Sequence, residues 1–145
     1  MTDATFEHFQ NELYRLVRGF RENTPHIKTS EYDEASLRSE YLDPLFKALG
    51  WDIGNTEQKP LHLRDVVVEK KQSVRGRPKR VDYLFRANGI DKFVCEAKRP
   101  FANIDRFAYD AQNYAANAGV YIALLSDFEH LILYVVGARP DRNHP

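Results

Sequence analysis

Two apolar segments joined by a tight turn place the strongest constraint on the fold of this chain. Residues 81–87 and 92–97 are rich in β-branched and aromatic side chains, and Asn88-Gly89 lies between them. An Asn-Gly pair between such segments is a strong signal for a hairpin. The segments are therefore predicted to be neighbouring antiparallel strands, and three consecutive valines at residues 66–68 predict a strand before them.

Apolar periodicity predicts the remaining elements. Apolar residues three and four apart predict a helix over residues 5–20 and a second helix that begins near Asp33 or Ser36. Pro44 is expected to kink or split the second helix, and Gly50 to end it. Residues 21–30 are predicted as a connection and residues 75–78 as a turn. A third helix over residues 105–118 is predicted to end at Gly119, with strands at 121–125 and 131–136.

The order of these elements predicts an α/β fold with a mixed sheet and helices on its faces. The chain has 145 residues, of which 43% are hydrophobic and 29% charged, which suits one compact domain. We assign residues 1–137 to that domain. Residues 138–145 are predicted to be a tail or a linker to a further domain.

Several classes of protein do not fit this sequence. The single cysteine, Cys95, cannot form an internal disulfide or a cysteine-based zinc site, and it is expected to be a small buried hydrophobe. The apolar runs are far shorter than the roughly 20 residues that span a bilayer. The N-terminus has acidic residues where a signal peptide is basic. We therefore expect a cytoplasmic protein without a membrane partner.

The net charge of zero conceals one strongly basic segment. The chain has 21 basic and 21 acidic side chains, yet residues 70–80 contain six basic residues and no acid. Basic residues at this density either contact the phosphates of a nucleic acid or form a solvated hairpin tip, and we favour phosphate contact. The predicted DNA-binding residues are Lys70, Lys71, Arg75, Arg77, Lys79 and Arg80.

Three charged residues interrupt the apolar strands. Alternation places Glu96 and Lys98 on one face of their strand, and the hairpin brings Asp82 into the neighbouring strand. Two carboxylates and a backbone carbonyl form a plausible partial shell for Mg²⁺, and a nearby lysine can orient or deprotonate a water. The alternative is that these residues are solvated charges of a half-exposed sheet.

Four segments in order resemble a known family. They are residues 34–51 (EASLRSEYLDPLFKALGW), 76–85 (GRPKRVDYLF), 93–100 (FVCEAKRP) and 110–120 (DAQNYAANAGV). Together they resemble the N-terminal nuclease domain of type I restriction motor subunits and of fused type II restriction-modification enzymes, in the PD-(D/E)xK superfamily. The resemblance covers residues 33–136. It implies a restriction-endonuclease-like fold of three layers, α/β/α, with an αβββαβ core.

The resemblance also implies roles for individual residues. It makes Asp82 and Glu96 metal ligands together with the carbonyl of Ala97, and Lys98 the catalytic lysine. Glu40 is the matching helical acid that completes the metal site in this family, and its alternative is a surface charge. Gln112 matches the family's glutamine near the metal or a DNA phosphate, whereas Tyr114 departs from the family spacing and is expected in the core. Valine replaces the family's proline at residue 81.

The function implied is Mg²⁺- or Mn²⁺-dependent hydrolysis of DNA phosphodiester bonds in a restriction-modification system. Methyltransferase, specificity or motor domains are the expected partners. Two copies of the nuclease domain are expected to pair transiently for double-strand cleavage. Two alternatives stay open: a nuclease-fold module that binds DNA or other domains without cutting, and a nuclease that acts on DNA ends or on RNA.

Overall fold

A five-stranded mixed sheet forms the centre of the molecule. The computed structural model describes residues 5–74 and 76–137. Its strands lie in sequence order across the sheet: β1 (Val66–Val74), β2 (Arg77–Ala87), β3 (Ile90–Ala97), β4 (Ile122–Ser126) and β5 (Leu131–Val135). Only β3 and β4 pair in parallel, and the other neighbours are antiparallel.

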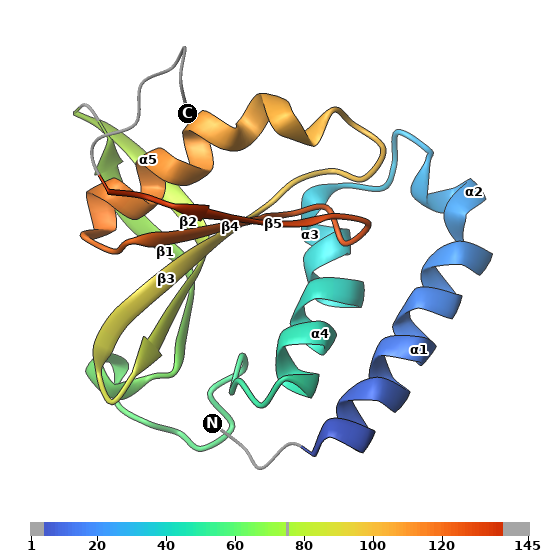
Figure 1. Ribbon diagram of the computed structural model, residues 1–145, viewed down its shortest axis with the longest axis horizontal. Helices are drawn as coiled ribbons and strands as arrows, with labels where there is room; N and C mark the ends of the chain where they lie inside the picture. The colour runs from blue at the N-terminus through green and yellow to red at the C-terminus, as the bar shows by residue number, and fades with distance from the viewer. Residues whose placement is uncertain (1–4, 75, 138–145) are drawn as a thin grey trace.

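Helices cover both faces of this sheet (Figure 1). Helix α5 (Ala108–Ala118) connects the parallel strands β3 and β4 and packs on one face. Helix α1 (Phe6–Glu22) and the helical segment that includes α3 (Glu34–Leu37) and α4 (Asp43–Ala48) lie on the other face. The three-layer α/β architecture predicted from the sequence is thereby confirmed, and it is consistent with a restriction-endonuclease-like fold.

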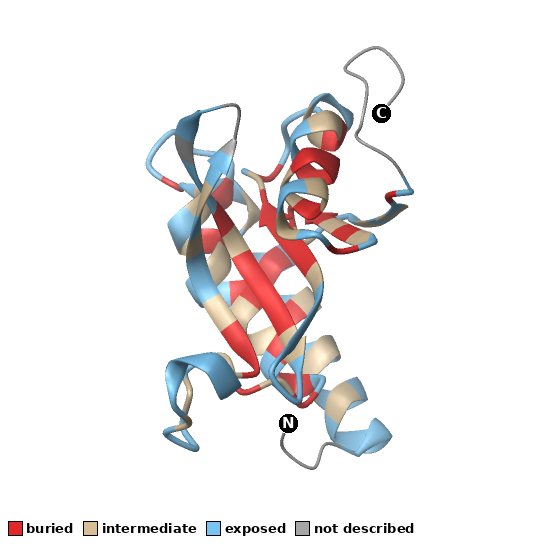
Figure 2. Cartoon of the chain, turned by 90° about the vertical axis from the view of Figure 1, so that its left-hand side faces the viewer, coloured by how far each residue is buried: buried red, intermediate tan, exposed pale blue. Residues whose placement is uncertain are grey.

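The alternation of side chains along β2 and β3 separates the two cores. Phe85 and Cys95 are buried on the side of α1 and α4, whereas Leu84 and Val94 are buried on the side of α5. Figure 2 shows buried residues running along the middle of the sheet and on helix α5. Cys95 is fully buried, as expected for a small hydrophobe.

The second predicted helix is split, as the position of Pro44 predicts. A π-helical turn, Arg38–Leu42, separates α3 from α4, and Pro44 lies in the first turn of α4. Proline has no N–H to donate to the preceding turn, so a widened turn before it keeps the chain helical. The predicted connection at residues 21–30 contains a short helix, α2 (Thr24–Ile27), that the sequence reading did not include.

The first hairpin is longer than predicted. Residues 75–78 were expected to form a turn, but β2 begins at Arg77 and pairs there with Val74 of β1. The prediction of a turn is wrong for residues 77 and 78, because ladder hydrogen bonds extend the strands almost to Gly76, whose φ of 75° closes the turn. Pro78 is tolerated because β3 pairs with β2 only from Tyr83 onward, so β2 has one neighbour at this point.

Short 3₁₀ turns complete the described residues. Leu61–Leu63 precedes β1, and Ile104–Phe107 leads into α5, which ends at Gly119 with a φ of 73° as predicted. Within residues 5–74 and 76–137, no helix is long and apolar enough to cross a membrane. The predicted tail at 138–145 lies outside the described residues.

Replacing Phe85 by alanine tests the core beneath α4. The Phe85 ring is 0% exposed and packs against Phe46, Trp51 and Phe93. Its removal leaves a cavity and is expected to lower the free energy of unfolding by about 3–5 kcal/mol. Urea denaturation measures this change. Tyr14→Ala, at a ring that is 72% exposed, is the control and should cost far less. Equal losses would contradict the packing described.

Candidate active site

Asp82 and Glu96 lie opposite one another on neighbouring strands. Tyr83 of β2 pairs with Cys95 of β3, so the antiparallel register places Asp82 across from Glu96. Oδ2 of Asp82 accepts a hydrogen bond of 2.8 Å from the backbone N–H of Ala97. The strand pairing that the sequence predicts is therefore also what brings the two carboxylates together.

Lys98 is held at the end of β3 by several contacts. Its backbone N–H donates to the carbonyl of Ser126 at 2.9 Å, which fixes the chain beside β4. Its Nζ lies 3.4 Å from Oε1 of Glu96 and 3.9 Å from Oε1 of Glu34. The same ammonium lies 4.6 Å from the centre of the Phe107 ring. Lys98 is thus a cation held between two acids and an aromatic face.

Burial dominates the electrostatics of this cluster. Glu96 is 5% exposed. Its burial and the neighbouring Asp82 charge raise the pKa of Glu96 to about 8, although Lys98 opposes the shift. Burial also raises the pKa of Asp82, against the Ala97 N–H and the charges of Arg38 and Lys98. A cation placed beside both carboxylates would favour their ionised forms.

One oxygen of Glu96 lacks a partner. Among the described residues, Oε2 of Glu96 is buried and receives no hydrogen bond. A buried, unpaired carboxylate oxygen is costly unless another group binds it. The oxygen is therefore suited to a cation or to a water in this cluster.

The structure does not bring Glu40 to these groups. Oε2 of Glu40 accepts a hydrogen bond of 2.9 Å from the Tyr32 hydroxyl, and Glu34 is the helical acid that approaches Lys98. Glu34 in α3 and Arg38, the first residue of the π-helical turn, are four residues apart and share one side of the helical segment, whereas Glu40 lies two residues further into that turn. The resemblance points to Glu40, whereas the acid of this helical segment that lies near Lys98 is Glu34. The four-residue spacing of Glu34 and Arg38 was the signal available in the sequence.

Gln112 and Tyr114 lie on α5, which packs on β3 and β4. Gln112 is 7% exposed, and its Nε2 has no hydrogen-bond partner among the described residues. Burial, together with the charges of Glu96, Asp110 and other nearby acids, raises the pKa of Tyr114 to about 12. Tyr114 packs partly on the core, as expected, and it also lies within electrostatic reach of the carboxylate cluster.

The basic segment forms the outer end of the β1–β2 hairpin. Lys71, Arg77, Lys79 and Arg80 are exposed there and Lys70 is partly buried, while Arg75 lies outside the described residues. Figure 2 shows this end of the hairpin as largely exposed. The segment is continuous with Asp82 along β2, so positive charge is available beside the carboxylates.

Metal binding at this cluster would need ligands beyond side chains. In the part of the chain that the structure describes, no three His, Cys, Asp or Glu side chains are grouped to hold a metal ion. Asp82 and Glu96 can supply two carboxylates, and a backbone carbonyl and waters can supply the rest, which is a common arrangement for Mg²⁺.

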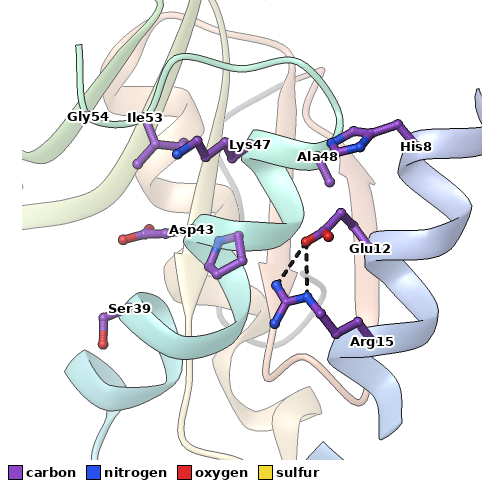
Figure 3. Close-up of a pocket in the computed structure, with 10 residues that line it drawn as sticks. His8, Glu12, Arg15, Ser39, Asp43, Lys47, Ala48, Ile53 and Gly54 are labelled. Atoms are coloured by element: carbon purple, nitrogen blue, oxygen red, sulfur yellow. Dashed lines mark hydrogen bonds and ion pairs between the residues drawn. The ribbon is translucent and has the colours of Figure 1, made fainter. Parts of the chain in front are cut away.

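A separate cavity of about 640 Å³ lies between α1 and α4 (Figure 3). Polar side chains line it, among them Glu12 and Arg15, which bind each other at 2.8 Å. Asp82, Glu96 and Lys98 do not line this cavity. The carboxylate cluster is therefore not part of it.

Comparison with known proteins gives one informative relative. The type II restriction enzyme and methyltransferase RM.Eco57I of Escherichia coli is 35% identical over 130 residues, which cover 86% of this chain. This chain is similar to one part of that protein. It spans 13% of the relative's length. No family model matches the chain, and no solved structure matches it.

Glu96→Gln tests the electrostatics of the cluster. In the native state the pKa of Glu96 is about 8, well above its ordinary value of 4.5. The unfolded chain therefore loses this proton first, and the wild-type protein loses stability as pH rises from about 4.5 to about 8. Without metal, Glu96→Gln should be more stable than wild type at pH above 8 by on the order of 1–3 kcal/mol.

Urea denaturation at pH 5 and pH 8.5 in EDTA measures this difference. At pH 5 the two proteins should differ much less. Glu31→Gln, at an exposed position, is the control and should follow wild type at both pH values. A Glu96→Gln protein that is no more stable than wild type at pH 8.5 would mean that Glu96 is not a destabilising buried charge.

Proposed function

We propose that this chain is the Mg²⁺-dependent DNA endonuclease domain of a restriction-modification system and belongs to the PD-(D/E)xK superfamily. The observation that carries the proposal is the placement of Asp82 opposite Glu96, with Lys98 3.4 Å from Glu96. An acid on one strand and an acid-x-lysine on the next are the residues that give the superfamily its name. The similarity to a restriction enzyme and methyltransferase gives independent support.

The residues present suit a divalent cation. Asp82, Glu96 and the Ala97 carbonyl would hold it, and the buried Oε2 of Glu96 has no other partner among the described residues. The oxygen donors match the preference of Mg²⁺ and Mn²⁺. When bound, the metal would act as a Lewis acid on the scissile phosphate.

The chain's own residues would divide the remaining work. Lys98, held at the end of β3, is placed to orient the attacking water. As the neutral amine it would accept the proton of that water, and the ammonium so formed would offset the negative charge that develops on the phosphate oxygens. Phe107 and the short 3₁₀ turn around it shield one side of the ammonium. Gln112 has an unused amide on the helix above β3 and is a candidate for contact with water or phosphate.

DNA would approach along the basic hairpin. The exposed cations of β1 and β2 lead directly to Asp82, so phosphates bound there would continue into the carboxylate cluster. The methyltransferase, specificity or motor domains of a larger assembly would supply sequence recognition, and transient pairing of two domains would allow both strands to be cut. The relative, which by its name combines a restriction enzyme and a methyltransferase, supports the part of this proposal that joins the domain to a methyltransferase.

Cleavage of supercoiled plasmid tests the proposed activity. With Mg²⁺ or Mn²⁺ the wild-type protein should nick or linearise the plasmid, and Asp82→Asn and Lys98→Met should each lower the rate by at least about 10²-fold, because each removes a group that acts on the reacting atoms. Lys92→Met, at an exposed lysine of β3, the strand that ends just before Lys98, is the matched control and should cut like wild type. EDTA should stop all cleavage.

Metal binding decides the case in which the isolated domain does not cut. Mn²⁺ binding that is lost in Asp82→Asn would support a competent site that needs a recognition or motor domain. Absence of metal binding both with and without a short DNA duplex present would overturn the proposal and leave a nuclease-fold binding module. Cleavage limited to DNA ends or to RNA would keep the chemistry and change the substrate.

The choice between Glu34 and Glu40 is a second test of the site. Glu34 lies 3.9 Å from Lys98, whereas Glu40 is bonded to Tyr32. We therefore expect Glu34→Gln to slow cleavage by about tenfold or more and Glu40→Gln to slow it much less. Plasmid cleavage rates measure both variants, and thermal unfolding confirms that each is folded. If Glu40→Gln slowed cleavage more than Glu34→Gln, Glu40 and not Glu34 would be the helical acid of the site.

A further inference from the structure

Arg38 connects the carboxylate cluster to the basic hairpin. Its Nη1 lies 3.6 Å from Oδ1 of Asp82, and its Nη2 donates to Oε1 of Glu69 at 3.1 Å. The other oxygen of Glu69 lies 3.9 Å from Nη1 of Arg80. Alternating charges therefore run from the partly buried Asp82 through Arg38 and Glu69 to Arg80 on the exposed hairpin.

Arg38 faces the oxygen of Asp82 that does not accept the Ala97 N–H. Oδ2 of Asp82 already accepts the Ala97 N–H, and Oδ1 faces the Arg38 guanidinium. A guanidinium and a divalent cation repel one another strongly when both are close to one carboxylate in a partly buried site. In this arrangement Arg38 neutralises Asp82 and at the same time opposes metal binding.

The contacts of Arg38 leave it able to move. A guanidinium has five N–H groups, and the Nε–H of Arg38 is buried without a hydrogen-bond partner among the described residues. Its partner Glu69 is 48% exposed, so solvent weakens that ion pair. Glu69 also has a φ of 53° within β1, a left-handed conformation that is unfavourable for this residue type. A phosphate can replace both carboxylates with a charge-assisted, bidentate contact.

We propose that Arg38 is a phosphate-operated latch on the metal site. Without DNA it pairs with Asp82 and Glu69 and weakens metal binding. When a DNA phosphate arrives along the basic hairpin, Arg38 transfers to it and frees Oδ1 of Asp82 for the metal. This inference rests on the proposed nuclease function and adds that the site takes up its metal together with DNA.

The proposal requires metal and DNA binding to change in opposite directions in Arg38→Met, which keeps most of the side-chain volume and removes the charge. Calorimetry with Mn²⁺ in the absence of DNA should show affinity at least about fivefold tighter than wild type. Fluorescence anisotropy of a short labelled duplex in EDTA should show DNA affinity weaker by about threefold or more, with a salt dependence reduced by about one phosphate contact.

Glu69→Gln keeps the proposal testable if Arg38→Met does not fold, because Glu69 lies near the surface. Without the Glu69 charge, Arg38 keeps Asp82 but loses Glu69 as an ion-pair partner and should hold Asp82 more strongly. The affinity for Mn²⁺ should therefore weaken by a few-fold. Arg18→Met, an exposed arginine on α1, is the matched control for both measurements and should leave them unchanged. Circular dichroism and thermal unfolding establish that each variant is folded.

The outcomes separate this proposal from the proposed function. Weaker Mn²⁺ binding in Arg38→Met would mean that Arg38 merely holds Asp82 in place, and unchanged DNA binding would mean that it contacts no phosphate; either result overturns the latch. Unchanged Mn²⁺ affinity in Glu69→Gln also contradicts it. Mn²⁺ binding in Asp82→Asn that equals wild type would instead overturn the metal site itself, whatever Arg38 does.

Discussion

The close placement of two carboxylates, the buried Glu96 and the partly buried Asp82, is the constraint on which the rest of the site depends. Two acids on adjacent strands repel one another, and burial makes each charge more costly. Within the described residues, Lys98, Arg38 and the Ala97 N–H partly offset this cost. Each of these groups comes from a segment whose position the sheet or the helical layer fixes, so the local electrostatics depend on the whole fold.

The architecture explains how a polar cluster can exist inside an apolar sheet. Both faces of β2 and β3 are covered along their middle, where Leu84, Phe85 and Val94 are buried. The charged residues lie toward the end of β3, where the strand leaves the sheet and the helical segment beginning at Glu34 approaches from the other layer. The core therefore surrounds the cluster with buried side chains, while the end of β3 and the helical segment bring its charges together.

The charges that offset the carboxylates of the cluster would also compete with the proposed metal. Lys98 and Arg38 compensate the carboxylates when no cation is present, and each is held by a second acid, Glu34 and Glu69 respectively. A site built in this way suits a reaction in which a polyanion and a divalent cation enter together, because the phosphate can take over the positive side chains. The net charge of zero conceals this arrangement, since its effect is local.

Local sequence determined the hairpin, the split helix and the pairing of Asp82 with Glu96, because turn chemistry and the two-residue period act over a few residues. The same alternation placed Lys98 beside Glu96. Tertiary structure alone decided three features: the extension of β1 and β2 into the basic segment, the approach of Glu34 in place of Glu40, and the contacts of Arg38 with Asp82 and Glu69. Each of these features depends on how distant segments pack, which no local pattern specifies. They involve the length of strand pairing, the direction in which side chains leave a π-helical turn, and contacts across more than 30 residues of chain.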